Sequence, residues 1–184
     1  MTELDFEVVN VIGWISYRQE LDLAALADTF RERREIMSVT YEPADNHWLQ
    51  TNFEPDGTYV AFYRSGRCSI TGVDSIEQFE DVVGRVNAVM RDLLEFEFEP
   101  ESKVANLVVT ASLDVPVHLE KLAVLLGLEQ CEYEPEQFPA LMYRDPDSDA
   151  VINVFSSGKL VCTGLSCHDA IDSALSDFNS KVKQ

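Results

Sequence analysis

The chain has 184 residues, 46% of them hydrophobic, which is enough for one or two globular domains with an apolar core. Its 33 acidic residues outnumber 14 basic ones, for a net charge of −19. No apolar run approaches the ~18 residues of a membrane span. The acidic start MTELDFEVV lacks the basic residues of a secretory signal. We therefore expect a cytoplasmic protein without a membrane partner.

The acidic excess is spread along both halves of the chain and is not an acidic tail. A solvated surface of this kind favours solubility and repels itself. A cytoplasm of high salt, as in a halophile, would screen that repulsion, because the Debye length is about 3 Å at molar ionic strength. The composition therefore indicates a halophilic protein.

The cysteines and histidines form no catalytic or metal-binding pattern. The four cysteines include no CxxC pair and are expected to be free thiols, and the three histidines are dispersed. Cys162, Cys167 and His168 are near in sequence, but Cys162 alternates toward the predicted helices and fits a buried thiol better than a zinc ligand. The eight glycines are scattered and form no phosphate loop. The sequence therefore predicts no enzyme, no metal and no cofactor.

The chain contains two copies of one unit, which we place at residues 1–100 and 101–184. Three landmarks recur at a constant offset of 92 residues: Tyr41-Glu42-Pro43 as Tyr133-Glu134-Pro135, Ser65-Gly66 as Ser157-Gly158, and Thr71-Gly72 as Thr163-Gly164. Val9-Asn10-Val11 matches Ala105-Asn106-Leu107 at an offset of 96. A constant offset across separated landmarks indicates an internal repeat.

The first copy begins with a strand predicted at Val8–Tyr17. A helix follows, with Asp22 as its N-cap and an apolar face of Leu23, Leu26, Ala27 and Phe30. Short strands run to Val73, with a hairpin turn at Asp56-Gly57. Ser75 and Gln78 then form a predicted capping box at the start of a long amphipathic helix.

The second copy repeats this plan, with a strand predicted at Val104–Leu113 and a short helix after it. Pro116 suits the N1 position of that helix and Gly127 its C-terminal cap. Strands are predicted from Leu128 to Thr163, followed by a final helix. The fold class is therefore α+β, with each copy a strand, a helix, antiparallel strands and a longer helix. Because both long helices cover one side, the opposite sheet face is left open.

Strand alternation assigns mixed polar and apolar side chains to that open face. Three sets share a side of their strands: Asn106, Val108 and Thr110; Val151, Asn153 and Phe155; Lys159, Val161 and Thr163. Uniformly apolar sets would indicate core. This mixture of asparagine, threonine and lysine with valine and phenylalanine suits a surface that meets a partner.

The segments YEPEQFPALMYR (Tyr133–Arg144) and VFSSGKLVCTG (Val154–Gly164), together with the repeat, resemble the TATA-box-binding protein family of archaeal and eukaryotic transcription. The resemblance implies a pseudo-twofold saddle, a curved antiparallel sheet with helices on the convex side. It also implies a general transcription factor whose concave face binds A·T-rich promoter DNA in the minor groove, in a nucleoid-associated role.

The resemblance also assigns DNA-contacting residues. The minor groove of A·T pairs presents only acceptors, which asparagine and threonine can meet as donors, and apolar wedges can enter between base steps. The expected hydrogen-bonding residues are Asn10, Asn106, Thr71 and Thr163, and the groove-floor residues are Ile12, Val108 and Val161. The expected wedge is Phe138 with Phe155, Pro139 is a further DNA contact, and Arg67, Arg144 and Lys159 are expected to reach phosphates.

The same resemblance implies protein partners. Glu134 and Glu136 flank Pro135 in the loop that, in the family, receives transcription factor B. The RNA polymerase machinery is a further expected partner, as is a second copy of the chain, bound through the concave face when no DNA is present.

The first copy departs from the family pattern. At an offset of 92, Asn46 stands where the second copy has Phe138, and Tyr63, Asn52 and Ser69 stand in place of Phe155, Arg144 and Val161. Trp14 stands at a groove-facing position where the second copy has Thr110. The sequence therefore leaves DNA binding by the first copy open. The alternative is a degenerate paralogue that regulates the transcription machinery through protein contacts, and a third interpretation is an altered face that binds a different ligand.

Overall fold

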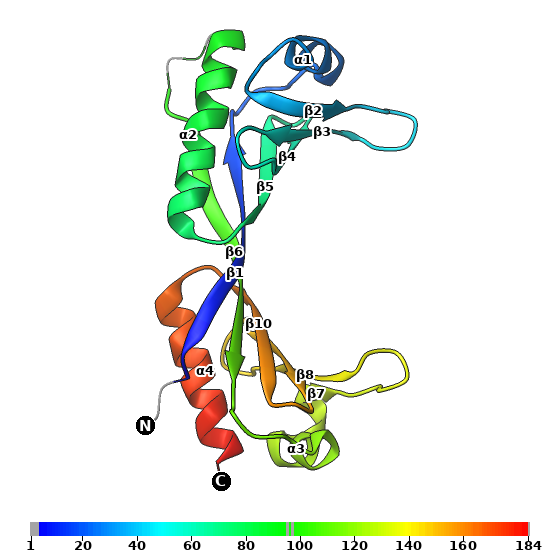
Figure 1. Ribbon diagram of the computed structural model, residues 1–184, viewed down its shortest axis with the longest axis vertical. Helices are drawn as coiled ribbons and strands as arrows, with labels where there is room; N and C mark the ends of the chain where they lie inside the picture. The colour runs from blue at the N-terminus through cyan, green and yellow to red at the C-terminus, as the bar shows by residue number, and fades with distance from the viewer. Residues whose placement is uncertain (1–3, 95, 97, 184) are drawn as a thin grey trace. The chain divides into compact units, whose positions relative to one another are not determined.

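The computed structural model describes residues 4–94, 96 and 98–183 (Figure 1). The first three residues of the acidic start, on which the expected lack of a secretory signal partly depends, lie outside the described residues. Among the residues described, no helix has the length and apolar character needed to cross a membrane.

The described chain divides into two compact units, one holding Asn10–Ala105 and the other holding the remainder. Within it, neighbouring strands pair in the order β2 (Ile36–Thr40), β3 (Trp48–Phe53), β4 (Thr58–Tyr63), β5 (Arg67–Val73), β1 (Phe6–Ser16), β6 (Glu101–Ser112), β10 (Lys159–Leu165), β9 (Val151–Phe155), β8 (Ala140–Arg144) and β7 (Cys131–Glu132). The division follows spatial contacts, whereas the repeat boundary at 100/101 follows sequence landmarks. That boundary stays a prediction.

The elements of the first copy follow the predicted order. They are β1 (Phe6–Ser16), α1 (Leu23–Phe30), β2 (Ile36–Thr40), β3 (Trp48–Phe53), β4 (Thr58–Tyr63), β5 (Arg67–Val73) and α2 (Ile76–Leu93). The β2–β3, β3–β4, β4–β5 and β5–β1 pairs are all antiparallel. Figure 1 shows α2 lying along one face of these strands.

The second copy repeats the order, and the α+β class is confirmed. Its elements are β6 (Glu101–Ser112), α3 (Leu119–Leu126), a 3-10 turn (Leu128–Gln130), β7 (Cys131–Glu132), β8 (Ala140–Arg144), β9 (Val151–Phe155), β10 (Lys159–Leu165) and α4 (His168–Val182). Gly127 ends α3 with a φ of 97°, as the sequence predicts. The N1 position predicted for Pro116 is wrong, because α3 begins at Leu119. The Val117 N–H donates to the carbonyl of Ser156 at 2.9 Å and so holds the chain outside the helix past Pro116.

One face of each unit's strands is buried beneath its long helix. In the first unit Val11, Ile15 and Ile70 are fully buried, together with Val86 and Met90 of α2. In the second unit Leu107, Val109, Leu160, Cys162, Ile171, Leu175 and Phe178 are 0–1% exposed. Because side chains alternate along a strand, burial of one set directs the next set to the opposite face.

Gly13 permits the close approach of α2 to β1. A Cβ added at this position would lie 2.3 Å from the ring of Phe79 and 2.7 Å from the carbonyl oxygen of Lys103. The strand pairing with β5 shifts register between Val11 and Gly13. The packing of β1 beneath α2 therefore requires a residue without a side chain.

Side chains cap both helices of the first unit. Asp22 accepts from the N–H groups of Ala24 and Ala25, both at 3.1 Å, which confirms it as the N-cap of α1. Ser75 accepts from the N–H of Gln78 at 3.2 Å. The predicted capping box is only half formed, because the Gln78 side chain accepts from the Asp74 N–H and not from that of Ser75.

Asp56 fixes the turn between β3 and β4 and joins it to α2. Its carboxylate accepts from the Thr58 hydroxyl at 2.8 Å and from Arg85 of α2 at 3.3 Å. Partial burial acts to raise the pKa of Asp56, but the hydrogen bonds from Thr58 and Arg85 prevail and lower that pKa to about 2. The ionised form of Asp56 therefore stabilises the folded state.

We expect Asp56→Asn to lower the free energy of unfolding by about 1 kcal/mol at neutral pH, a value reduced by solvent screening at this partly exposed site. Because the folded-state pKa lies below the unfolded value, this stabilisation is complete above the unfolded pKa, at about pH 4. It should disappear as the pH falls through about 2. Urea denaturation across this pH range measures it. Asp45→Asn, the same charge change at an exposed loop residue, is the control, and a pH-independent difference would contradict the prediction.

Candidate nucleic-acid interface

The open face of each unit, opposite its long helix, carries most of the predicted DNA-binding residues. Asn10 and Ile12 are partly exposed on β1, and Asn106 and Val108 are partly exposed at the matching positions of β6. The residues between them are mostly buried under α2 and α4. The alternation predicted from the sequence is therefore confirmed in these strands.

Asn10 and Asn106 are each fixed by a backbone hydrogen bond to a glycine. The side-chain oxygen of Asn10 accepts from the Gly72 N–H at 2.9 Å, and that of Asn106 accepts from the Gly164 N–H at 2.7 Å. Since an N–H donates only to the amide oxygen, each side-chain NH₂ is directed away from that glycine. The Asn10 NH₂ also lies 3.3 Å from the Thr71 hydroxyl. Both asparagines are thus oriented to offer donors.

The second unit brings the predicted contact residues Val161 and Thr163 onto one strip with three further residues of the predicted open face. Val161 lies opposite Thr110 of β6 and Asn153 of β9, and Thr163 lies opposite Val151. The Asn153 side-chain oxygen is buried without a hydrogen-bond partner among the described residues. An unsatisfied buried acceptor costs about 1–3 kcal/mol, so it is most easily retained where a ligand supplies the donor.

Phe138 and Phe155 form an aromatic pair in the second unit. Their ring centroids are 6.1 Å apart with the planes at 68°, an edge-to-face contact. Phe138 lies in the loop before β8 and is 43% exposed, and Pro139 beside it is also exposed. The structure therefore brings together the two rings predicted to form a wedge, and it leaves one of them partly open to solvent.

A shallow hollow of about 650 Å³ lies beside Phe155. Its lining includes Thr110, Lys159 and Val161 together with Asp5, just before β1, and Glu7 within β1. Two carboxylates therefore lie near the predicted phosphate-binding lysine. The sequence reasoning missed Asp5 and Glu7, because their approach depends on how β1 lies against the second unit's strands.

Two of the three predicted phosphate-binding cations have intramolecular partners. The guanidinium carbon of Arg67 lies 4.7 Å from the ring centroid of Trp14. Arg144 pairs with Glu132 at 3.4 Å, and these side chains are 56% and 66% exposed. Exposed ion pairs contribute only about 0–1 kcal/mol, so a phosphate can displace Glu132 at small cost. Lys159 is exposed and forms no ion pair within the described chain.

In the first unit, the residue at the position of Arg144 forms hydrogen bonds within the unit itself. Asn52, at the position of Arg144, accepts from the Ser38 hydroxyl at 2.7 Å and donates to the Gly57 carbonyl at 2.8 Å. Both halves of its amide are therefore engaged within the β2–β3–β4 region. Asn52 stabilises the hairpin and has no charge to offer a phosphate.

The first unit also contains an aromatic pair that the sequence reasoning missed. Trp48 of β3 lies directly opposite Tyr63 of β4, with ring centroids 6.2 Å apart. Alignment at the fixed offset compared Asn46 with Phe138 and so found no first-copy ring. The available signal was that Trp48 follows Asn46 by two residues, the spacing that keeps a side chain on one face of an extended strand.

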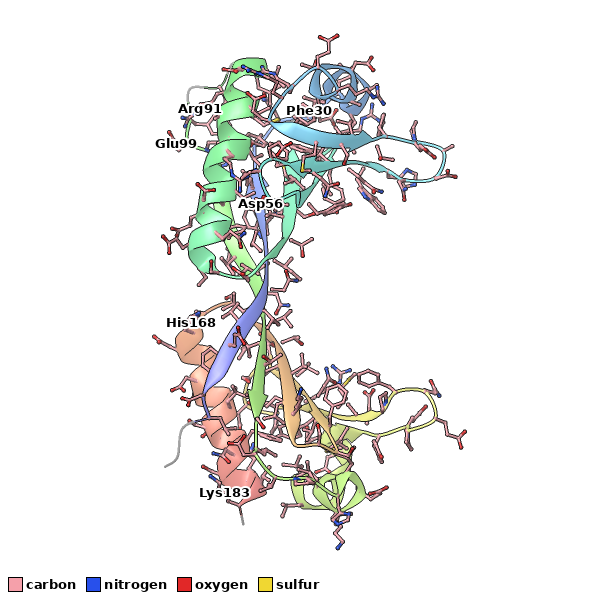
Figure 2. All side chains as sticks on the ribbon, in the orientation of Figure 1. Phe30, Asp56, Arg91, Glu99, His168 and Lys183 are labelled. Atoms are coloured by element: carbon pink, nitrogen blue, oxygen red, sulfur yellow. The ribbon has the colours of Figure 1, made fainter. Side chains whose placement is uncertain are left out.

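The two predicted partner residues lie in the exposed loop between β7 and β8. The Glu134 carbonyl accepts from the N–H groups of Gln137 and Phe138, both at 2.9 Å, and its carboxylate accepts from the Gln137 amide. Glu136 is exposed, with no ion pair in the part of the chain that the structure describes. In the first unit Glu42 makes the matching turn with Asp45 and Asn46. Figure 2 shows each loop extending away from the strands that it connects.

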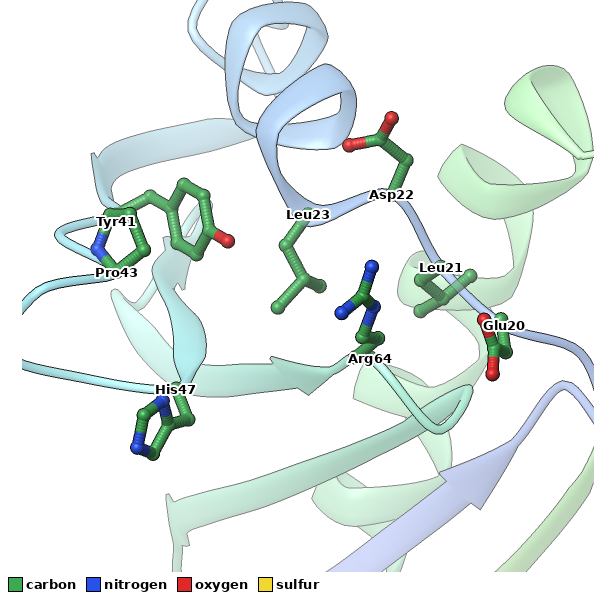
Figure 3. Close-up of a pocket in the computed structure, with 8 residues that line it drawn as sticks. All are labelled: Glu20, Leu21, Asp22, Leu23, Tyr41, Pro43, His47 and Arg64. Atoms are coloured by element: carbon green, nitrogen blue, oxygen red, sulfur yellow. The ribbon is translucent and has the colours of Figure 1, made fainter.

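A further pocket of about 610 Å³ lies at the base of the first unit's loop (Figure 3). Its wall includes Arg64, His47 and Tyr41 together with the acidic Glu20 and Asp22. Asp22 already caps α1, and no predicted DNA-binding residue lines the pocket. Among the described residues, no group of three or more histidine, cysteine or acidic side chains is placed to hold a metal ion.

The chain is similar to known proteins over nearly its whole length. The family described as "Transcription factor TFIID (or TATA-binding protein, TBP)" matches residues 5–93 and 101–184. TATA-box-binding protein C of Halobacterium salinarum is 38% identical over 97% of both chains. TATA-box-binding protein 2 of Haloferax volcanii is 35% identical over 96% of this chain and 92% of its own. The solved structure of Methanococcus jannaschii TBP matches with a TM-score of 0.81 and 30% identity, over 97% of this chain and 98% of that one.

The two glycines that fix the asparagines provide a matched test. Gly72 and Gly164 have φ angles of 86° and 96°, so alanine is strained at both. A Cβ at Gly164 would lie 2.1 Å from the Asp149 carbonyl oxygen, whereas a Cβ at Gly72 has no atom within 4 Å. We expect Gly72→Ala to cost about 1–2 kcal/mol of unfolding free energy. Gly164→Ala should cost at least about 1 kcal/mol more, from the added steric strain. Equal losses in urea denaturation would contradict this geometry.

Proposed function

Because the chain belongs to the TATA-box-binding protein family, we propose that it binds A·T-rich promoter DNA in the minor groove and recruits transcription factor B. The aromatic pair Phe138–Phe155 is the main observation in support. A phenylalanine that is 43% exposed and packs edge-on against a second one lies outside the unit's buried core. Apolar side chains that enter minor-groove base steps unstack them at a cost of a few kcal/mol, which the added contact offsets.

The asparagines supply the second argument for the minor groove. A·T pairs offer only the acceptors adenine N3 and thymine O2 there. Asn10 and Asn106 have their oxygens occupied by glycine N–H groups, so the groups they present are donors. A surface of fixed donors and apolar side chains with few cations matches that groove better than it matches bare phosphates.

The first test is fluorescence anisotropy of a labelled TATA-box duplex across ~0.1 to 3 M KCl, with and without transcription factor B. High salt screens the repulsion between DNA and a chain of charge −19. We expect sequence-specific binding that persists or strengthens as salt rises. Folded protein that binds no duplex at any salt would contradict the proposal.

We expect Phe155→Ala to weaken binding to the TATA-box duplex about ten- to a hundredfold, because base–aromatic contacts contribute about 1–3 kcal/mol each. Leu125→Ala, an exposed apolar truncation on α3 of the same unit, is the control and should bind the duplex like the unchanged protein when transcription factor B is absent. Thermal unfolding checks that both variants are folded. Unchanged affinity of Phe155→Ala would remove the wedge from the proposal.

The proposed contact with transcription factor B lies at Glu134 and Glu136. Both carboxylates are exposed in a loop held by its own turn, so they can meet basic residues of a partner without rearrangement. The neighbouring α3 exposes Val124 and Leu125 by 71% and 51%, where the first copy has Asp28 and Thr29. An apolar patch beside an acidic loop supports a protein partner at this unit.

We expect Glu134→Lys with Glu136→Lys to abolish capture of transcription factor B in a pull-down, because like charges then oppose each other. Glu42→Lys with Asp45→Lys makes the same charge change in the first unit's loop and should leave capture intact. If both double variants retain the complex, the acidic loop is not the docking site. If both lose it, net charge and not position determines binding.

The matched relatives are named as TATA-box-binding proteins, which does not favour the alternative of a paralogue that acts only through protein contacts. Contact with the RNA polymerase machinery and a homodimer through the open face in the absence of DNA stay predictions.

A further inference from the structure

We propose that Trp48 and Tyr63 form a second base-stacking pair, through which the first unit binds the minor groove with a different base preference from the second. The inference rests on the proposed DNA binding and assigns contact residues to the copy for which the sequence left DNA binding open. Asn46 lacks a ring, but Trp48, two residues further along the chain, supplies an aromatic ring larger than that of phenylalanine.

The geometry of the two aromatic pairs supports this assignment. Tyr63 and Phe155 occupy matching positions on β4 and β9, the last residue of each strand. Phe138 approaches Phe155 from the loop before β8, whereas Trp48 approaches Tyr63 from the first residue of β3, directly across the ladder. The centroid separations, 6.2 Å and 6.1 Å, are nearly equal. A ring in contact with the strand-end aromatic is therefore present in both units.

The Trp48–Tyr63 pair lies on the face opposite the core. Leu49 and Phe62, the adjacent residues on the same strands, are 0% exposed beneath the helices, whereas Trp48 and Tyr63 remain partly exposed. Within the described residues, neither the Trp48 indole N–H nor the Tyr63 hydroxyl has a hydrogen-bond partner. Both side chains are partly exposed, so these two groups are accessible to a ligand that supplies hydrogen-bond partners.

A cation lies on the same face. Arg67 stacks over Trp14, and the register of β1 and β5 places Trp14 opposite Ser69. Aromatic rings interleaved with arginine are the combination that holds stacked bases beside a phosphate backbone. The first unit thus has rings and a cation, even though Asn52 is engaged within the hairpin.

The polar groups of this pair predict a base preference. The phenylalanine rings of the second unit carry no hydrogen-bonding group. The indole N–H can donate to the acceptors of an A·T pair, and the tyrosine hydroxyl can also accept from the N2 amino group of guanine. The half-site bound by the first unit should therefore tolerate a G·C pair that the half-site of the second unit excludes.

Tryptophan emission tests the stacking directly, because the chain has only Trp14 and Trp48. In a Trp14→Phe variant, emission reports Trp48 alone, while anisotropy of the labelled TATA-box duplex reports binding. We expect emission from Trp48 to be quenched in proportion to bound DNA. Trp48→Ala should weaken binding about tenfold or more, and Trp48→Phe should restore most of the affinity because a phenyl ring still stacks.

The outcomes separate this inference from the proposed function. Binding that requires Phe155 but leaves Trp48 emission unquenched and Trp48→Ala at full affinity would overturn the inference and leave the proposed function intact. Absence of duplex binding at every salt concentration would remove both. Thermal unfolding of Trp48→Ala and Trp48→Phe distinguishes lost contact from lost fold.

Tyr63→Phe separates stacking from hydrogen bonding. It should leave the quenching of Trp48 unchanged. The affinity ratio is the affinity for the all-A·T duplex divided by that for a duplex with a single G·C replacement at one end of the site. Tyr63→Phe should raise this ratio about ten- to a hundredfold above that of the unchanged protein. An unchanged affinity ratio would overturn the assigned base preference.

Discussion

Burial of one strand face beneath a long helix determines what the other face of each unit presents. Val86 and Met90 of α2 are fully buried over the first unit's strands, and Leu175 of α4 is fully buried in the second. Since successive side chains alternate, a strand with one face buried in the core can contact a ligand only through the side chains of its other face. Gly13 shows the same constraint at the backbone, because any Cβ there would overlap the Phe79 ring of α2 and the Lys103 carbonyl.

The two units share the bonds that fix the asparagine donors, but they differ at one position predicted to contact phosphate. Asn10 and Asn106 make the same bond to a glycine N–H. Arg144, in contrast, forms an exposed ion pair, while Asn52 at the matching position is engaged on both sides of its amide. At these positions the first copy has lost the charge contact of Arg144 and preserved the hydrogen-bonding geometry of the asparagine.

Period-two alternation and local capping were readable from the sequence because they depend on neighbours along the chain. Asn106, Val108 and Thr110 share the open face, and Asp22 caps α1, as expected. The Trp48–Tyr63 and Arg67–Trp14 contacts were missed because each depends on the register between two strands. A fixed offset aligns positions, but Phe138 and Trp48 reach equivalent partners from positions two residues apart along their repeats. Pro116 was misplaced for a related reason, since a backbone bond to Ser156 delays the helix.

Under the proposed function, the negative charge of the chain makes DNA binding depend on its aromatic pairs. A net charge of −19 repels DNA, and of the three cations predicted to meet phosphates, two have partners within the chain. Molar salt shortens the Debye length to about 3 Å and removes most of that repulsion, but it equally weakens any attraction of cations to phosphates. Stacking and the burial of apolar surface are not screened in this way. A DNA-binding surface that functions in such salt must therefore draw its affinity from rings and fixed donors. The open faces supply these as the pairs Phe138–Phe155 and Trp48–Tyr63 and the oriented amides of the two asparagines.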